Sequence, residues 1–203
     1  RLGRLQHLLV RFQADYRKSG SWGTDFGLSD FRHEMPDPLV IDGSIHHFDA
    51  IRNLTGGDCR TVSGLAWNAP WGSFKGMSSG LYLFAMDNDT RASYEGNMSG
   101  AGQQNVWHHE YYRAECEDGA LTIDADHILR LQRAGMPDEI VPFGELPLIG
   151  HQQVIGDFLD WLDGGDAPET VLDDNVKSMA MVFAAVAAGK TGKTVAAADF
   201  TPG

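Results

Sequence analysis

The 203-residue sequence lacks the features that mark several common classes of protein. No apolar run approaches the roughly 20 residues that a membrane-spanning helix needs. The first apolar stretch is interrupted by Gln6 and His7, and no small-residue cleavage site follows it, so it does not resemble a secretory signal. The two cysteines, Cys59 and Cys116, have no Cys-x-x-Cys spacing. We expect two free thiols in a cytoplasmic protein, with a single disulfide as the alternative.

Positive charge is also scarce, since 16 Lys and Arg residues face 28 Asp and Glu residues and the net charge is −12. A nucleic-acid-binding surface needs a basic stripe, so we expect a small molecule or another copy of the chain as partner. Neither Gly-x-Gly-x-x-Gly nor a Walker loop occurs, so no nucleotide site is recognisable within the chain. Because the sequence opens on Arg1 rather than on a methionine, we expect a fragment of a longer protein.

The residue pattern predicts one α+β domain over residues 1–203. Residues 5–12 indicate a strand, and a polar loop over 16–38 is long enough to suggest a function. A helix is expected to begin between Asp42 and Ser44 and to end at Gly56-Gly57. Further strands are expected over 59–67, 81–86, 90–94, 105–117, 120–124 and 128–132.

Two helices complete the predicted domain, over 151–162 and from Asp173 to Gly189. The first presents an apolar face of Val154, Ile155, Phe158, Leu159 and Leu162. The second is expected to bury Val176, Met179, Ala180, Val182, Phe183 and Val186. Successive hairpins build a large, mostly antiparallel sheet, and helices on one face leave the other face open for homo-oligomer formation.

The segment from Asp42 to Asp49 concentrates the residues that could carry chemistry. Asp42 and His46 are four residues apart and project to the same side of a helix, and Asp49 is within reach of the same imidazole. A carboxylate beside a histidine fixes its tautomer and stabilises its charged form, as a general base near neutral pH requires.

Other interpretations of this segment stay open. Asp42 could cap the helix while His46 serves only the structure. A metal site of His46, His47 and Asp49 is another alternative, although adjacent histidines on a helix diverge by about 100 degrees. In the preceding loop, Trp22 could offer an aromatic platform and Arg32 a charged donor to a sugar. We expect these two residues, together with His47 and Asp49, to orient or bind the substrate.

The run Asp42-Gly-Ser-Ile-His46-His-Phe-Asp49 resembles the Asp-x-x-x-His segment of the glucose-fructose oxidoreductase, inositol dehydrogenase and rhizopine-catabolism (Gfo/Idh/MocA) family. The likeness continues through essentially the whole chain, in Leu83-Phe-Ala-Met-Asp, Tyr94-Glu-Gly, Arg113-Ala-Glu-Cys-Glu-Asp-Gly119 and Asp174-Asn-Val-Lys-Ser-Met-Ala. It departs from many relatives at Phe31-Arg-His-Glu-Met-Pro-Asp-Pro38, where they have a Gly-rich run, which leaves the substrate open.

The resemblance implies a C-terminal substrate-binding, catalytic and oligomerisation domain of an NAD(P)-dependent sugar or polyol dehydrogenase. Its Rossmann domain, which binds NAD or NADP and supplies a Lys from a Glu-Lys-Pro segment, would lie outside this chain. Asp42 and His46 match the family's catalytic pair, and a homodimer or homotetramer is implied. We therefore expect residues 1–203 alone to be inactive. A non-catalytic oligomerisation or ligand-sensing domain is the alternative function.

Overall fold

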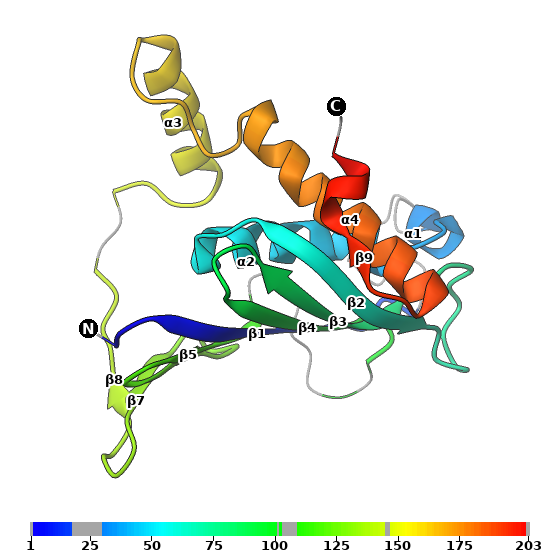
Figure 1. Cartoon of the computed structure of the whole chain (residues 1–203), viewed down its shortest axis with the longest axis horizontal. Coiled ribbons are helices and arrows are strands. Elements are labelled where there is room, and N and C mark those ends of the chain that lie inside the picture. Colours follow the sequence, from blue (N-terminus) through cyan, green and yellow to red (C-terminus); the bar gives the residue numbers. More distant parts are fainter. Residues whose placement is uncertain (1, 18–29, 101, 103–108, 145–146, 202–203) are drawn as a thin grey trace.

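The computed structural model describes residues 2–17, 30–100, 102, 109–144 and 147–201. They form a large sheet with its main helices on one face, as Figure 1 shows. The nine strands follow the spatial order β8-β7-β6-β5-β1-β4-β3-β2-β9. All neighbouring pairs are antiparallel except β1 and β4, which run parallel. The predicted α+β fold with a mostly antiparallel sheet is confirmed.

The bounds of the elements agree closely with the sequence pattern over most of the chain. The strands are β1 (Leu5–Gln13), β2 (Cys59–Trp67), β3 (Ser79–Met86), β4 (Arg91–Asn97), β5 (Tyr111–Cys116), β6 (Gly119–Ile123), β7 (Leu129–Gln132), β8 (Glu139–Ile140) and β9 (Val195–Ala196). The helices are α1 (Asp30–Glu34), α2 (Ile45–Thr55), α3 (His151–Leu162) and α4 (Leu172–Thr191), with a π-helical segment over Leu39–Ser44 and a 3₁₀ turn over Ala197–Phe200. Among the described helices, none has the length and apolar character needed to cross a bilayer.

Alternation along the strands places the core between the sheet and two helices. In β1, Leu8, Val10 and Phe12 are buried while their neighbours point to the opposite face. Helices α2 and α4 cover the buried face (Figure 1). The largest buried side chains of this core are Phe12, Phe48, Tyr82, Phe84, Tyr94 and Met181.

The opposite face of the sheet remains apolar at its centre, and none of the described helices covers it. Leu65, Leu81 and Leu83 are 62%, 48% and 62% exposed on this face. The strand register aligns Leu81 with both Leu65 and Glu95, so the apolar centre borders a polar pair of Arg11 and Glu95. This is the open face that the sequence predicts.

The helix that carries Asp42 begins earlier than predicted. Pro38 precedes a π-helical turn over Leu39–Ser44, which continues directly into α2. Proline suits such a position because it has no N–H to leave unsatisfied. Asp42 lies inside this continuous path rather than at its start, so the interpretation of Asp42 as a helix cap is wrong. The predicted end is confirmed at Gly56, which has a φ of 64° and donates to Arg52 O at 2.9 Å.

Helix α4 passes beyond its predicted end and turns a different face inward. It continues through Gly189 and stops before Gly192, which has a φ of 66°. A Cβ at position 189 would lie 2.9 Å from the Cβ of Ala66, so this glycine permits close packing on β2. Met179 and Phe183 are 40% and 43% exposed, contrary to the prediction. Small residues let the helix approach the sheet instead, and the buried set is Ser178, Ala180, Met181, Val182, Ala184, Ala185 and Ala188.

Three further differences affect the surroundings of the candidate site. The predicted loop over residues 16–38 contains the short helix α1. Strand β5 begins at Tyr111 rather than at residue 105, and residues 105–108 lie outside the described residues. His109 and Glu110 precede β5, and their side chains bond to Ala125 O and to His47. Helix α3 forms as predicted, but its apolar face is not buried.

Candidate functional site

The structure joins Arg32 to Asp42. Arg32 lies on α1, and its Nε is 2.5 Å from Asp42 Oδ2 in the π-helical segment. Both side chains are mostly shielded, at 13% and 20% exposed, and the guanidinium also lies over the rings of Tyr16 and Phe31. The short helix α1, within the predicted loop, therefore places the Arg32 guanidinium beside the Asp42 carboxylate. Arg32 forms an ion pair with Asp42 and so offsets part of the negative charge of that carboxylate.

His46 follows Asp42 on the same helical path, four residues later, at the start of α2. Its side chain is exposed, whereas that of the next residue, His47, is buried. An exposed imidazole one turn beyond a partly shielded, ion-paired carboxylate can exchange protons with a bound molecule. This arrangement fits the chemistry that the sequence assigns to the pair.

A buried polar chain lies beneath the helix start. Ser44 Oγ hydrogen-bonds with Tyr94 Oη at 2.9 Å and with Leu39 O at 2.8 Å. Tyr94 Oη is in turn 3.0 Å from His47 Nδ1. Burial raises the pKa of the Tyr94 hydroxyl, so that it remains a neutral donor. The chain ties the π-helical turn to β4 in the core and so fixes the backbone between Asp42 and His46.

His47 is a buried member of this chain and has both ring nitrogens engaged. Its Nε2 lies 3.2 Å from Glu110 Oε1, and its Nδ1 lies beside Tyr94. The tautomer of the ring decides which nitrogen donates and which accepts. The ring also packs 4.9 Å from that of Phe12. Because His46 is exposed and His47 is held in the core, the two do not converge as the alternative metal site would require.

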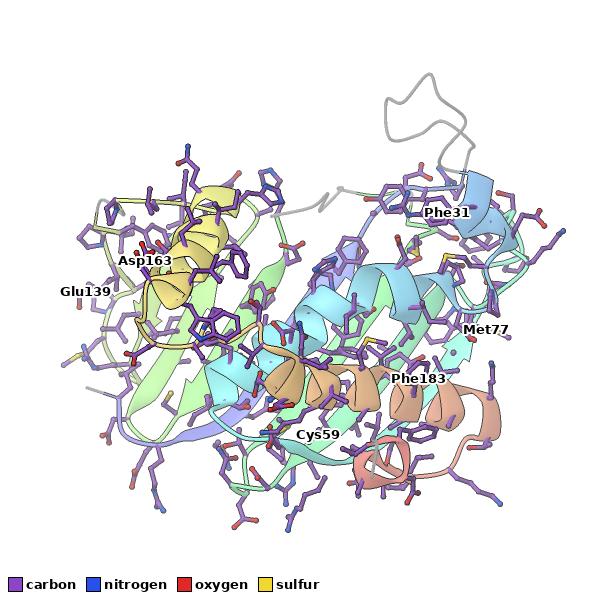
Figure 2. The ribbon with its side chains drawn as sticks, turned by 90° about the horizontal axis from the view of Figure 1, so that it is seen from above. Phe31, Cys59, Met77, Glu139, Asp163 and Phe183 are labelled. Atoms are coloured by element: carbon purple, nitrogen blue, oxygen red, sulfur yellow. The ribbon has the colours of Figure 1, made fainter. Side chains whose placement is uncertain are left out.

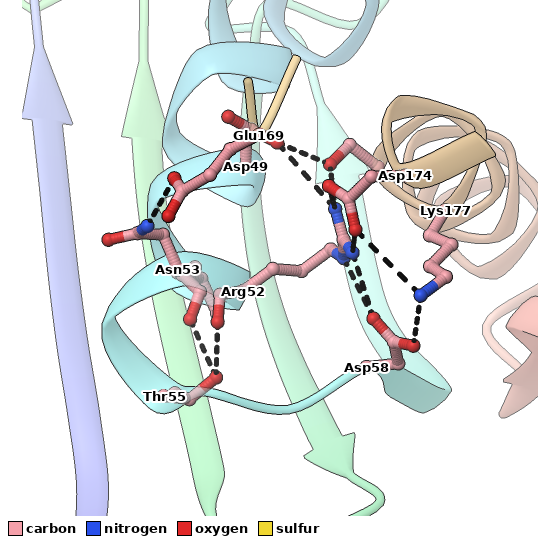
Figure 3. Close-up of polar contacts among 10 residues, drawn as sticks. Asp49, Arg52, Asn53, Thr55, Asp58, Glu169, Asp174 and Lys177 are labelled. Carbon is pink, nitrogen blue, oxygen red and sulfur yellow. Dashed lines mark hydrogen bonds and ion pairs between the residues drawn. The ribbon is translucent and has the colours of Figure 1, made fainter. Parts of the chain in front are cut away.

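The Asp49 carboxylate, expected near the imidazole of His46, bonds to α4 in the structure. Ser178 Oγ donates to Asp49 Oδ1 at 2.6 Å, and Arg52 Nη1 donates to Ser178 Oγ at 2.8 Å. Figure 3 shows Asp49 on α2 beside this cluster, which joins α2 to α4 and to the start of β2. Arg52 is only 8% exposed and pairs with Asp58 at 2.9 Å and Asp174 at 2.8 Å. Asp49 therefore anchors the helix that carries His46.

The charges of this Arg52 cluster stabilise each other. Burial opposes ionisation of Asp58, but hydrogen bonds from Lys177 and Arg52 outweigh it and lower the pKa of that carboxyl. The hydrogen bond from Arg52 is the main cause of the lowered pKa of Asp174. These side chains line a hollow of about 550 Å³ on the surface between α2 and α4. The paired charges indicate a structural brace rather than a catalytic group.

Some residues of the site could not be found by sequence spacing. Tyr94 and Glu110 lie 47 and 63 residues from His47, and the tertiary fold brings them together. Trp22, the proposed aromatic platform, lies outside the described residues. The cysteines are both free, as expected, and burial raises the pKa of Cys59 to about 12. A thiol with so high a pKa is a poor nucleophile at neutral pH.

The comparison with known sequences finds a bacterial relative of greater length. The chain is 31% identical over 208 residues to the uncharacterized protein y4oX of Sinorhizobium fredii (strain NBRC 101917 / NGR234). The match covers 98% of this chain and 56% of that protein, so the chain spans little more than half of the relative's length. No family model matches the sequence.

Several solved structures with the same fold are oxidoreductases. An oxidoreductase from Agrobacterium radiobacter, in complex with NAD+, L-tartaric acid and magnesium, superposes with a TM-score of 0.77 at 18% identity, over 98% of this chain and 58% of that one. The aldose-aldose oxidoreductase from Caulobacter crescentus, complexed with glycerol, gives 0.76 at 17%, over 96% and 56%. A levoglucosan dehydrogenase with NADH and levoglucosan gives 0.74 at 14%, over 97% and 59%.

The sequence relative and the solved structures are all longer than this chain, and the chain matches a similar share of each. Each solved structure is matched over nearly all of residues 1–203 but over less than two thirds of its own length. This chain therefore has the α+β fold that forms part of several NAD(P)-dependent and sugar-related oxidoreductases.

Proposed function

We propose that residues 1–203 are the C-terminal, substrate-binding half of an NAD(P)-dependent oxidoreductase of the Gfo/Idh/MocA family, acting on a sugar, polyol or related hydroxy compound. The observation that carries the proposal is the helical path that presents His46 four residues after an Arg32-paired Asp42. The fold that surrounds this path supports it, because oxidoreductases crystallised with glycerol or levoglucosan share that fold.

The nicotinamide cofactor belongs, in this proposal, to the part of the full-length protein beyond this chain. The sequence contains neither Gly-x-Gly-x-x-Gly nor a Walker loop, the Gly-rich patterns that bind the phosphates of nucleotides. NAD or NADP, when bound, supplies the hydride acceptor or donor. The chain's own residues then have two tasks, which are to orient the substrate hydroxyl and to move its proton.

In the direction of oxidation, His46 accepts the proton of the substrate hydroxyl while the carbon that bears it loses a hydride. The neutral imidazole becomes an imidazolium in this step, and the alcohol becomes a carbonyl. Asp42 stabilises the imidazolium across one helical turn. Arg32 holds the Asp42 carboxylate in place, and a lysine from the other half of the protein completes the group, as the family resemblance implies.

The other predicted site residues act on position rather than on the proton. Buried His47 holds the start of α2 against Tyr94 and Glu110, and Asp49 ties the same helix to Ser178 on α4. Trp22 remains a proposed platform for the sugar ring. Their common effect is to keep His46 at a fixed place relative to the substrate.

Replacing Asp42 with Asn in the full-length protein tests the role of the carboxylate. We expect kcat to fall by roughly tenfold to a hundredfold, because the charge that supports the imidazolium is lost while the proton acceptor remains. Steady-state turnover with a panel of polyols and aldoses measures the effect. Asp89→Asn is the matched control, since Asp89 lies in an exposed turn with a φ of 64° that Asn tolerates. Equal turnover in both variants would remove Asp42 from the mechanism.

The open sheet face is proposed as the surface that joins copies of the protein. Leu65, Leu81 and Leu83 form an exposed apolar centre there, and such patches mark association sites. We expect the full-length protein to be a dimer or tetramer in light scattering. Leu83→Asp places a charge at the centre and should yield smaller species, whereas Arg60→Asp at an exposed position near the sheet edge should leave the mass unchanged. A wild-type monomer at high concentration would contradict the proposal.

A further inference from the structure

The short helix α1 is held firmly against the loop that joins β2 to β3. Lys75 N donates to His33 O at 2.8 Å, and the ring of His33 stacks on that of Phe74 at 4.4 Å with an angle of 5° between the planes. The two backbones also meet closely, because a Cβ at Gly76 would lie 2.0 Å from Pro36 O. A helix of five residues gains little stability on its own, so these contacts fix the place of α1 and of the side chains that it carries.

Phe31 on α1 lies directly beside the ion pair of the candidate site. The guanidinium carbon of Arg32 is 4.6 Å from the centroid of the Phe31 ring, and the same guanidinium pairs with Asp42. Phe31 nevertheless remains 46% exposed. Because the cation covers one face of the ring, the exposed part belongs to its other face and its edge. Figure 2 shows Phe31 at this end of the molecule, on α1.

The exposure of Phe31 does not by itself mark a site, since single apolar side chains lie on the surface of most proteins. Phe31 differs from such side chains in two ways. Its backbone belongs to a segment that the loop between β2 and β3 holds in place, and its ring stacks on a guanidinium that is itself fixed to Asp42. The ring is therefore held in one orientation before a ligand arrives, which lowers the free-energy cost of binding.

A flat aromatic ring selects the shape of the molecule that binds to it. Its faces carry partial negative charge, so they attract the C–H groups of a ligand that lies flat on them. One face of a pyranose presents several C–H groups together, while its hydroxyls point outward to polar groups. An open-chain polyol has no such fixed face and must order its rotatable bonds to lie on the ring. Phe31 beside Asp42 therefore matches a cyclic sugar better than a linear one.

We propose that Phe31 selects a pyranose as the substrate, by receiving the C–H face of the sugar ring while a hydroxyl of that sugar lies beside Asp42 and His46. This inference rests on the proposed function and narrows its substrate from a sugar or polyol to a cyclic sugar. The aromatic ring of Phe31, rather than its apolar volume alone, is the selecting feature. The inference does not depend on Trp22, which would add a second aromatic surface.

Matched pairs of aldose and alditol test the proposal in the full-length protein. D-glucose and D-glucitol, D-galactose and galactitol, and D-mannose and D-mannitol differ chiefly in whether the carbon chain closes into a ring. We expect Phe31→Ala to raise KM for the aldoses that the wild type turns over by about tenfold to a hundredfold, because one aromatic contact is lost. The kcat for the aldoses and the KM for the alditols should change little. Phe31→Tyr should keep the wild-type preference, whereas Phe31→Leu, which retains apolar volume without the ring, should not.

Phe183→Ala is the matched control, because Phe183 is 43% exposed and lies apart from Phe31, on α4 (Figure 2). It makes the same truncation and should leave the KM values for both kinds of sugar unchanged. Equal changes for aldose and alditol in Phe31→Ala would overturn the proposal. A wild type that turns over only alditols, or full recovery of the preference in Phe31→Leu, would overturn it as well.

Saturation-transfer NMR tests the same contact without turnover. The aromatic protons of the full-length protein are irradiated in the presence of the three aldoses, with and without NAD+. We expect the ring hydrogens of at least one pyranose to receive saturation from the wild type and from Phe183→Ala, and to lose most of it in Phe31→Ala. No transfer to any of the pyranoses, or transfer that persists in Phe31→Ala, would refute the proposal. Transfer that depends on Phe31 in a protein without nicotinamide-dependent turnover would support the role of Phe31 and refute the proposed oxidoreductase function.

Discussion

Replacing His46 with Ala in the full-length protein is expected to lower kcat by about a hundredfold to ten-thousandfold. The proposed mechanism loses its proton acceptor, while the exposed position of the side chain on α2 leaves the core untouched. Turnover should be measured with reduced nicotinamide absorbance under saturating substrate. Circular dichroism and thermal unfolding then show whether the variant keeps its fold.

The control for this variant is Asn53→Ala, an exposed position two turns along the same helix. It makes the same kind of truncation away from the proposed chemistry and should leave kcat within about twofold, as for a surface change with small energetic effect. If His46→Ala instead loses about 1 kcal/mol of stability while its folded fraction turns over normally, His46 is structural. Loss of activity only on chelation of zinc would favour the metal site.

Arg52→Ala is expected to have the largest effect on stability, lowering the free energy of unfolding by about 3 kcal/mol. Arg52 is nearly buried and pairs with carboxylates on two other segments, so its loss leaves Asp174 without its main partner and Asp58 with Lys177 alone. We place the effect at the lower end for buried pairs because both carboxylates are partly exposed, at 40% and 36%. Urea unfolding followed by circular dichroism measures it.

The same cluster predicts how stability depends on pH. The pKa values of Asp58 and Asp174 are lower in the folded state than in the unfolded chain. The stability that these carboxylates contribute is therefore present above about pH 4, the pKa of Asp in the unfolded chain. It is lost as the pH falls through their lower pKa values in the folded state. Arg52→Ala should consequently show a shallower loss of stability in acid than the wild type. Equal slopes, or a stability change near zero, would show that the cluster contributes little. Arg52→Lys should recover only part of the loss, because lysine cannot bridge both carboxylates.

The sequence predicts most of the fold because its signals are local. Alternation along β1 and β2 and the glycine at position 56 determine their elements within a few residues. The faces of the last two helices are harder to predict, since Val154 and Phe183 satisfy helical spacing yet remain exposed. Periodicity identifies an apolar face, but it does not show whether this chain supplies the surface that covers it. In α4, alanines face the sheet because close approach favours small side chains over large ones.

The residues of the candidate site also fall into two groups, those that local spacing predicts and those that only the tertiary fold brings together. Asp42 and His46 are recognisable because four-residue spacing is a local property of a helix, and Arg32 lies near enough in sequence to be suspected. The link from His47 to Glu110 depends on where β5 lies in the sheet, which spacing cannot predict. Asp49 shows the limit of local reasoning. It is within reach of His46 on a helix, but its carboxylate turns to Ser178 on α4.

The pH dependence of kcat/KM tests the central claim most directly. The full-length wild-type protein should oxidise a sugar or polyol with NAD+ or NADP+, and kcat/KM should fall on the acidic side as the proton acceptor becomes protonated. Residues 1–203 alone should give no turnover. In His46→Ala the acidic limb should disappear along with most of the activity. An acidic limb of unchanged position in His46→Ala, or no nicotinamide-dependent turnover by the full-length protein, would contradict the account.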